Sequence, residues 1–302
     1  MLGGIIMNVI EIKNLTKDYG DKKGIFNINF SVKKGEVLGF LGPNGAGKTT
    51  TIRHLMGFSK ADKGSSSING LDCFDNSSEI QKFLGYLPGE IAFLDDMTGI
   101  KFIKFVAEMK GIKELSRANE LIKRFDLNAN GKIKKMSKGM KQKIGIICAF
   151  MQDPDILILD EPTSGLDPLM QNEFIKLIAE EKEKGKTILM SSHSFEEIEK
   201  TCDRAAIIKE GKIVAVENIA TLKESKQKIY NITFENGEMA KEFIKEGFKT
   251  KEVNGNNVTI TIKGDIMPFI KALAKYKVLN LESYTQSLED LFMHFYGGEN
   301  ND

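Results

Sequence analysis

The chain carries almost no excess of either charge. Its 302 residues include 43 lysines and arginines against 42 aspartates and glutamates, so the formal net charge is only +1. A surplus this small gives no overall electrostatic attraction toward a polyanion such as DNA or RNA. We therefore expect no nucleic-acid partner.

Cysteines and long hydrophobic runs are also scarce. Cys73, Cys148 and Cys202 lie far apart without metal-ligand spacing, which favours buried, reduced thiols over a disulfide framework. The longest apolar run, 144–151, falls well short of the roughly 18 residues that a membrane span needs. The apolar residues 1–6 are too few and too uncharged for a secretory signal. These absences predict a cytoplasmic protein.

The most informative stretch reads Gly42-Pro43-Asn44-Gly45-Ala46-Gly47-Lys48-Thr49-Thr50. It follows an apolar run typical of a buried strand and precedes a helix-like segment, the setting in which Gly-x4-Gly-Lys-[Ser/Thr] binds phosphate. Its glycines allow successive backbone N–H groups to surround an anion, and the helix N-terminus adds further donors. Lys48 can then reach the outer phosphates, and the Thr49 hydroxyl can ligate magnesium. The pattern predicts a nucleotide site.

Two carboxylates end a second buried strand. The apolar run 156–159 leads directly into Asp160 and Glu161, and open α/β sheets bind their ligands at the carboxyl ends of strands. Asp160 suits Mg²⁺, which prefers carboxylate oxygens. Glu161, one residue further, could accept a proton from an attacking water.

Two further positions gain meaning from their distance to Asp160. Ser137 and Gly139 begin a helix, where a cap and a close backbone approach suit an anion, although an ordinary helix cap is the better explanation in isolation. His193 ends the strand-like run 187–193 and could be structural. Ser137 precedes Asp160 by 23 residues and His193 follows it by 33, and this order favours a functional role for both.

Taken together, these motifs resemble the ATP-binding subunit of ABC transporters over roughly residues 7–220. The resemblance implies ATP and Mg²⁺ as ligands and a catalytic base at Glu161. It further implies that Tyr19 stacks on adenine, that 42–50 is the phosphate loop, and that Thr49 and Asp160 bind magnesium. His193 would contact the γ-phosphate. The loop 164–167, which includes Asp167, would cross to a partner subunit. Tyr19 could instead be a surface aromatic at a strand end.

The signature of the family reads Leu-Ser-Gly-Gly-Gln, whereas this chain has Met136-Ser137-Lys138-Gly139-Met140 and so keeps Ser137 and Gly139. By analogy, this helix start binds the γ-phosphate of a nucleotide held by another subunit. The resemblance thus implies a head-to-tail homodimer, or a pair with a related ATPase, that closes on ATP.

The sequence departs from the family at one more position. A glutamine usually follows the strand that ends at Pro88, but Gly89 and Glu90 stand here, so that Glu90 or a water is left to supply its oxygen. The following segment is where family members receive a polytopic membrane permease. Phe93, Leu94 and Met97 could form that docking surface or the core of a helical subdomain. A permease partner would hold the chain on the inner face of the cell membrane.

The fold class expected is α/β: a P-loop NTPase of ABC type with an antiparallel β subdomain, an inserted helical subdomain at about 89–152, and a small C-terminal α+β domain. We expect the ATPase domain at 7–221, a polar linker near 217–228, and the small domain at 222–302. Alternating apolar residues predict strands at 229–234 and 258–262. The small domain carries no motif that indicates chemistry.

The most specific function expected is an ATPase subunit that powers transport, and the single cassette and C-terminal extension look most like the drug- and peptide-export branch. A soluble ABC-type ATPase of an assembly machine, such as those of iron–sulfur assembly, is the main alternative. A third possibility is a module that binds nucleotide without hydrolysing it, in which Glu161 is idle.

Overall fold

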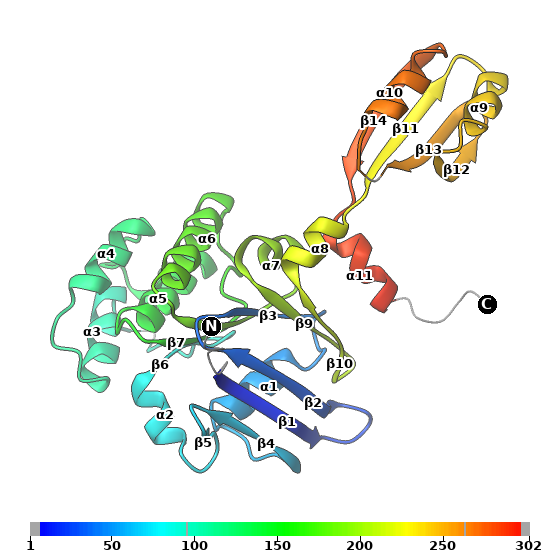
Figure 1. Cartoon of the computed structure of the whole chain (residues 1–302). Helices are drawn as coiled ribbons and strands as arrows, with labels where there is room; N and C mark the ends of the chain where they lie inside the picture. The colour runs from blue at the N-terminus through cyan, green and yellow to red at the C-terminus, as the bar shows by residue number, and fades with distance from the viewer. Residues whose placement is uncertain (1–6, 95, 263, 297–302) are drawn as a thin grey trace, which may run out of the picture. The chain divides into compact units, whose positions relative to one another are not determined.

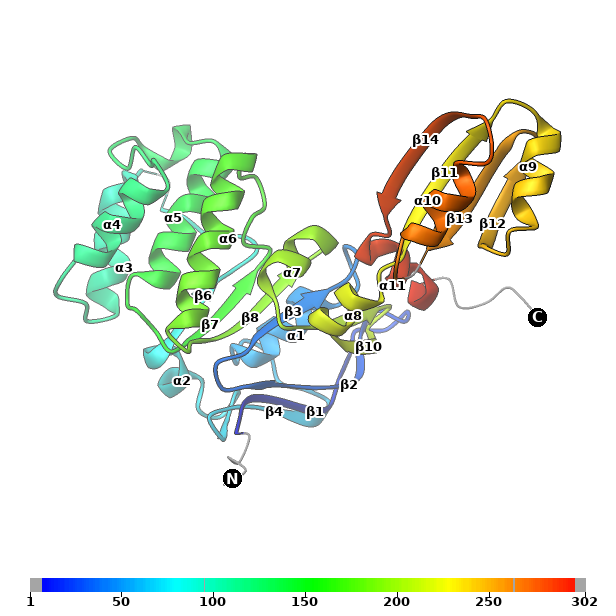
Figure 2. The same ribbon diagram turned by 45° about the horizontal axis from the view of Figure 1, so that its top comes forward.

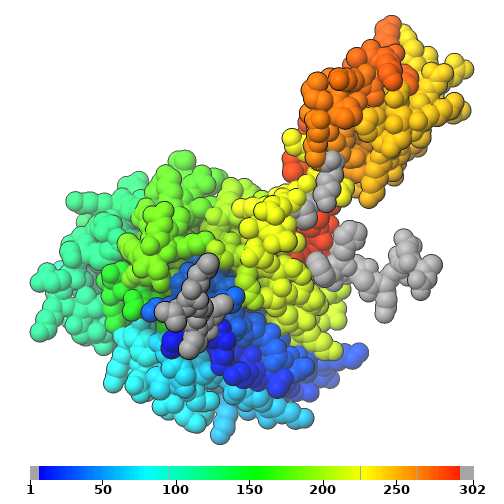
Figure 3. Space-filling view, in the orientation of Figure 1, coloured from blue at the N-terminus to red at the C-terminus, as the bar shows by residue number. Residues whose placement is uncertain are grey.

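The computed structural model describes residues 7–94, 96–262 and 264–296 (Figure 1). Contacts between residues divide the chain into two compact units that meet between Ile219 and Ala220. The boundary predicted from the sequence, between residues 221 and 222, lies two residues further along the chain. In the space-filling view, the N-terminal strands in blue and the helices near residue 110 in teal cover separate parts of the surface of the first unit (Figure 3).

A six-stranded sheet with the order β10-β9-β3-β8-β7-β6 forms the centre of the first unit. Neighbouring strands run parallel, except for the antiparallel pair of β9 and β10. Every residue of β3, β7 and β8 is buried, which explains their continuous apolar sequences, because helices and sheets cover both faces. The strands are β3 Val37–Leu41, β6 Leu84–Leu87, β7 Ile156–Asp160, β8 Thr187–Ser192, β9 Arg204–Lys209 and β10 Lys212–Asn218.

A second sheet in this unit is antiparallel, with the order β2-β1-β4-β5. Its strands are β1 Asn8–Asp18, β2 Gly24–Lys33, β4 Lys63–Ile68 and β5 Leu71–Asp72. Apolar and polar residues alternate along β2, and the apolar side chains point into the core. There the ring centroid of Phe30 lies 5.2 Å from that of Phe40 on β3. The antiparallel sheet and helix α1 lie on one side of the central sheet, with α6 and α7 on the other (Figure 2).

Helices cover the central sheet and form an inserted bundle. The covering helices are α1 Lys48–Leu55, α2 Ser77–Phe83, α6 Pro168–Glu183 and α7 Phe195–Thr201. The bundle consists of α3 Gly99–Met109, α4 Ser116–Arg124, the 3₁₀ turn η1 Ile133–Lys135 and α5 Lys138–Phe150. As its sequence predicts, Thr98 caps α3 and accepts a hydrogen bond from the Lys101 N–H. The central sheet, the antiparallel sheet and the inserted helical bundle together form the α/β fold predicted from the sequence.

The second unit is a small α+β fold around one antiparallel sheet with the order β12-β13-β11-β14. Its main elements follow the split βαββαβ order: β11 Lys228–Phe234, α9 Gly237–Ile244, β12 Lys249–Asn254, β13 Asn257–Ile262, α10 Met267–Leu273 and β14 Val278–Thr285, after which comes α11 Leu288–Tyr296. Its core joins the sheet to both middle helices, since Phe234 stacks near Phe243 of α9 and Tyr230 near Phe269 of α10.

The boundary between the two units lies within the polar segment 217–228, where the sequence predicts a linker. Part of this segment has regular structure, because β10 continues to Asn218 and helix α8, Ile219–Ser225, follows it. Ile219 is buried and fixes the start of this helix, a feature that the lysine-rich surface of the segment hides. Helix α6 starts at Pro168, because Asp167 caps it and proline is preorganised for the first helical position.

A buried ionic cluster ties the inserted helical bundle to the core. Glu181 of α6 is only 1% exposed and pairs with Arg117 of α4 at 2.7 Å, with Lys184 at 2.9 Å and with Lys186 at 3.5 Å. Arg124 of α4 pairs with Glu180 of α6 at 2.6 Å. Helix α4 is therefore joined to α6 by one ion pair that is largely removed from water, Arg117–Glu181, and by one whose carboxylate is half exposed, Arg124–Glu180.

We predict that Glu181→Ala lowers the free energy of unfolding by about 2 kcal/mol, because it removes the buried carboxylate that Arg117 and Lys186 share. The loss is limited because Arg117 keeps its pair with Glu120 and Lys186 its pair with Asp153. Urea unfolding followed by circular dichroism measures the change. Lys13→Ala is the control, since its ion pair with Glu11 is exposed and should contribute no more than about 0.5 kcal/mol. Equal losses in the two variants would contradict a stabilising role for the cluster.

Candidate active site

The loop between β3 and α1 has the geometry of a phosphate cradle. Gly45 and Gly47 adopt φ angles of +80° and +109°, in the region that favours glycine. A Cβ atom on Gly42 would lie 2.4 Å from the Ile208 carbonyl oxygen, so that only glycine fits there. The outer edge of the loop, 43–45, is exposed. The first N–H groups of α1 lack intrahelical acceptors and remain available for an anion.

Lys48, the first residue of α1, is folded back beneath this loop. Its side chain is only 4% exposed, and Nζ donates to the carbonyl oxygens of Gly42 at 2.7 Å and Pro43 at 3.2 Å. Nζ also lies 3.2 Å from Oε1 of Glu161. The ammonium is therefore fixed at the base of the cradle, with the carboxylate of Glu161 as its counter-charge.

Thr49 and Asp160 meet as the sequence predicts. The Thr49 hydroxyl donates to Oδ2 of Asp160 at 2.8 Å, and the Asp160 carboxylate is fully buried at the end of β7. The hydroxyl of Ser191 on β8 donates to the other oxygen, Oδ1. Asp160 is thus held from both sides by hydroxyls of neighbouring elements, and its oxygens lie beside the N-terminus of α1.

Glu161 and His193 form the next pair. Nδ1 of His193 lies 2.6 Å from Oε2 of Glu161, and the Glu161 N–H donates to the Ser191 hydroxyl at 3.0 Å. Glu161 has a φ of +51°, an uncommon conformation for a residue other than glycine that is typical of functional sites. This backbone turn directs the side chain away from Asp160 and toward Lys48 and His193.

The helix start at 137–139 packs directly on the loop that follows Glu161. Ser137 caps α5 through the Met140 N–H, as predicted. A Cβ atom on Gly139 would lie 2.5 Å from the Gly165 carbonyl oxygen, which requires glycine at this contact. Lys138 Nζ donates to the Ser164 hydroxyl at 2.8 Å. The two loops that the resemblance directs toward a partner subunit are therefore neighbours within one chain.

Tyr19 and Asp167 are the two predicted site residues that lie outside the cluster around Lys48 and Glu161. Tyr19 directly follows β1 and is 57% exposed, with its ring free to stack; the turn after it leads to Gly24, whose carbonyl oxygen lies against Gly47 of the cradle. Asp167 caps α6 by accepting the Met170 N–H at 3.0 Å. This cap is a local structural role, whatever else the residue contacts.

Gly89 lies against the Asp160 carboxylate, where a Cβ atom would be 3.0 Å from Oδ2. The side chain of the next residue, Glu90, is exposed. Beyond it, Phe93 is half-buried, with its ring 5.0 Å from that of Phe102 on α3, while Leu94 is 48% exposed. Phe93 therefore packs into the helical bundle, whereas Leu94 is exposed and a docking surface here stays a prediction.

Three residues that hold the site together were not recognised from the sequence. Ser191 braces Asp160, and Gln142 of α5 donates to the carbonyl oxygens of Glu161 and Pro162 at 3.2 and 2.9 Å. Glu197 of α7 is buried beneath the turn that carries His193. Ser191 and Glu197 lie close in sequence to the predicted site residue His193, and this closeness could have indicated them. For Gln142, the only indication in the sequence is its position near the start of a predicted helix.

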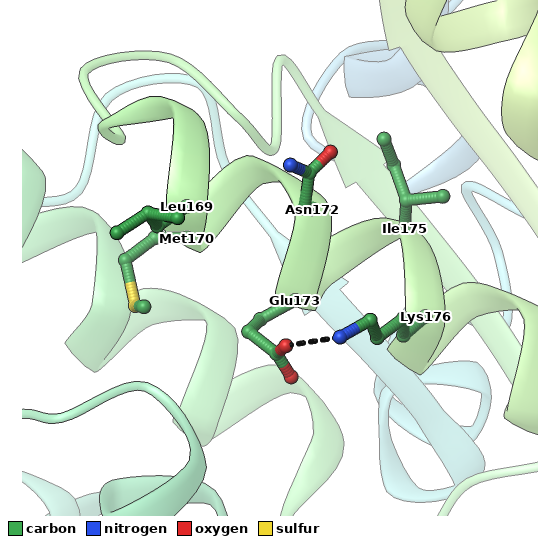
Figure 4. A pocket seen from close by; sticks show the side chains of 6 residues that line it. All are labelled: Leu169, Met170, Asn172, Glu173, Ile175 and Lys176. Atoms are coloured by element: carbon green, nitrogen blue, oxygen red, sulfur yellow. Dashed lines mark hydrogen bonds and ion pairs between the residues drawn. The ribbon is translucent and has the colours of Figure 1, made fainter.

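Two hollows lie near these loops. One of about 590 Å³ is bordered by the loop 163–165, the start of α6, His193 and the first turn of α7. Another of about 560 Å³ follows the outer face of α6, where Glu173 and Lys176 pair at 2.7 Å beside the exposed Leu169 (Figure 4). Its lining residues are Leu169, Met170, Asn172, Glu173, Ile175 and Lys176.

The fold and the loop geometry define a P-loop nucleotide-binding protein. A family model described as "ABC transporter" matches residues 25–164. An uncharacterized ABC transporter ATP-binding protein of Methanocaldococcus jannaschii is 36% identical over 293 residues, which covers 94% of this chain and 98% of the relative. The bacitracin transport ATP-binding protein of Bacillus licheniformis is 40% identical, covering 68% of each chain.

Solved structures agree with this assignment. An ATP-binding subunit of an ABC transporter superposes with a TM-score of 0.65 at 32% identity, covering 71% of this chain and 92% of the other. A dimeric bacterial ABC transporter cassette gives a TM-score of 0.63 at 25% identity, with 70% and 98% covered. The chain belongs to the ABC transporter ATP-binding proteins: it binds ATP and is an ATPase. The resemblance seen in the sequence is confirmed, and a non-transport machine is not favoured.

The match also agrees with two simple properties of the chain. No helix within the described ranges 7–94, 96–262 and 264–296 is long and apolar enough to cross a membrane. Members of this family act together with membrane subunits, which supply the spanning helices. Cys73 and Cys202 are buried and Cys148 is half-buried, and none of the three forms a disulfide.

We predict that Lys48→Ala weakens ATP binding at least tenfold, because the cradle loses the point charge that faces the phosphates. Equilibrium titration with a fluorescent ATP analogue measures the dissociation constant. Lys60→Ala removes an exposed lysine from the loop that follows α1 and serves as the matched control. An unchanged affinity in Lys48→Ala would show that nucleotide binds elsewhere.

Proposed function

We propose that this chain hydrolyses ATP at the interface between two subunits and thereby drives export through a separate membrane permease. The observation that carries the proposal is the line of contacts from Lys48 through Glu161 to His193, with distances of 3.2 and 2.6 Å, at the mouth of the phosphate cradle. A carboxylate that faces both the phosphate-binding lysine and a histidine is in position to act on a water beside the terminal phosphate.

Each of these side chains has a role that follows from its contacts. Phosphate oxygens entering the cradle compete with Glu161 for the Lys48 ammonium, which frees the carboxylate to accept a proton from water. His193 holds Oε2 of Glu161 and so limits its rotation. The N–H groups at the start of α1 and the fixed Lys48 charge stabilise the negative charge of the transferring phosphoryl group without reorganising.

The residues present fit Mg²⁺ bound together with the substrate. Thr49 and Asp160 offer oxygen atoms, the donors this ion prefers, and their side chains already converge at 2.8 Å. Within the described residues no cluster of three His, Cys, Asp or Glu could hold a metal unaided, so that substrate phosphates and waters complete the coordination. When bound there, Mg²⁺ supplies positive charge to the phosphate oxygens.

The proposed partner in hydrolysis is a second copy of the chain or a related ATPase, joined head to tail. Ser137 is exposed at the start of α5, where free N–H groups can reach a phosphate held by another subunit. The loop 164–167 lies beside it and leads to Leu169, which is 73% exposed. A large apolar side chain so accessible is suited to an interface.

The proposed membrane partner docks on the helical bundle. Leu94, Phe105 and Met109 are 48%, 38% and 74% exposed in this region and could receive the ends of permease helices on the inner face of the membrane. Export is proposed because relatives are named for bacitracin transport and for linearmycin resistance. Phe93 and Met97, which are half-buried, contribute less to this surface.

We predict that Glu161→Gln binds ATP but lowers its turnover at least a hundredfold, because the amide cannot accept the proton from water. With ATP bound and not consumed, the variant should accumulate as a dimer that light scattering detects. Wild-type turnover in this variant would instead contradict the role of Glu161 as the catalytic base.

Adding Ser137→Arg to Glu161→Gln tests whether the partner subunit completes the site. The bulky cation should abolish the ATP-dependent dimer and leave ATP binding by the monomer unchanged. Asn236→Arg is the matched control, since it removes another exposed helix cap, that of α9, outside the ATPase unit. A persistent dimer in the double variant would exclude a role for Ser137 across the interface.

We predict that the tagged chain, purified from detergent-solubilised membranes of its host, retains a polytopic membrane protein in stoichiometric amount. Glu108→Ala leaves the apolar docking surface intact and should preserve the complex, whereas Leu94→Arg with Met109→Arg should release it by placing charges where apolar contact is needed. Recovery of soluble partners alone would contradict the transport proposal while leaving the ATPase intact.

A further inference from the structure

A buried carboxyl that the proposed mechanism does not use lies directly beneath the catalytic residues. Glu197, in the first turn of α7, is only 8% exposed. Its Oε2 accepts a hydrogen bond from the Ser192 hydroxyl at 2.5 Å. Its Oε1 is buried and makes no hydrogen bond with any described residue. A charged carboxyl so withdrawn from water destabilises the fold unless hydrogen bonds or a counter-charge compensate it, so its presence here points to a role in the site.

Hydrogen bonds connect this carboxyl to the turn that carries His193. The Ser192 hydroxyl donates to Glu197 and accepts the Ser194 N–H at 2.9 Å, and the Ser194 hydroxyl accepts the Glu197 N–H at 3.3 Å. The Thr201 hydroxyl donates to the Glu197 carbonyl oxygen at 2.7 Å and secures the helical turn below. The residues on both sides of His193, Ser192 and Ser194, are therefore hydrogen-bonded to Glu197.

The same carboxyl also faces the loop that follows Glu161. The Thr163 hydroxyl lies close enough to affect its pKa, although only Ser192 meets the geometry of a hydrogen bond. Burial raises the pKa of Glu197 to about 7, and the charge of Glu161 adds to this effect, while Ser192, Thr163 and His193 oppose it. Cys202, directly after α7, is a further titratable neighbour, and Glu196 and Lys200 border the same hollow as Glu197.

We propose that Glu197 is a positioning residue of the ATPase site, whose neutral carboxyl fixes the His193 turn against the Glu161 loop. The proposal rests on the roles assigned above to Glu161 and His193. A neutral carboxyl satisfies Ser192 without burying a charge. An ionised one leaves an unpartnered negative oxygen beside Glu161, which loosens the turn and disturbs the Glu161–His193 pair.

The test compares three variants in steady-state ATPase assays. Glu197→Ala removes the anchor and should lower kcat about tenfold with KM within twofold, because small misplacements of catalytic groups are costly while the phosphate cradle is unchanged. Glu197→Gln, an isostere that is permanently neutral, should have a kcat close to that of the wild type at pH 6. Glu196→Ala is the control, since Glu196 is the exposed neighbour on the same turn, paired only with Lys200.

The pH profile separates positioning from a merely structural effect. The ratio of wild-type kcat to that of Glu197→Gln should fall severalfold from pH 6 to pH 8, because only the wild type gains a charge at this position. The proposal would be overturned if Glu197→Ala kept the wild-type kcat, or if Glu197→Gln were as slow as Glu197→Ala. A ratio of wild-type kcat to Glu197→Gln kcat that stays constant from pH 6 to pH 8 would also overturn it. Glu161→Gln, measured in the same assay, tests the proposed mechanism separately from the role of Glu197. A wild-type kcat in Glu161→Gln would overturn that mechanism.

Discussion

The site depends on one constraint, the parallel alignment of β3, β7 and β8 with all three strands buried. Parallel pairing brings their carboxyl ends to one edge of the sheet, so that residues distant in sequence meet there without long loops. Asp160 pairs with Ser191 in register across β7 and β8, and the Thr49 hydroxyl reaches the same carboxylate from α1. Because water is excluded beneath this edge, each of these polar contacts is strengthened and each is costly to break.

Backbone contacts then join this edge to the helical bundle. Gly139 approaches the Gly165 carbonyl oxygen more closely than any side chain would allow, and Gln142 holds the chain immediately after Glu161. Farther out, the ion pairs of α4 with α6 secure the bundle at its other end. A movement of the bundle is therefore felt by the residues that flank the proposed catalytic base, through contacts that involve no nucleotide.

The sequence predicted the elements whose pattern has a single physical explanation. The phosphate loop, the apolar strands ending at Asp160 and His193, and the cap at Ser137 follow from local chemistry, and the fold class follows from their order. Helix α8 and strands β12 and β14 were missed because their residues are mostly exposed and carry little apolar periodicity. The supports supplied by Ser191, Gln142 and Glu197 arise only from tertiary contact, which no spacing in the sequence reveals.

The close approach of Gly89 to Asp160 has a consequence for the space beside the carboxylate. With no side chain at this position, it is the main chain of Gly89 that faces the Asp160 carboxylate. A main chain cannot rotate away as a long side chain can, so a displacement of Gly89 changes the space beside the carboxylate directly. A glutamine in its place could adjust its side chain instead.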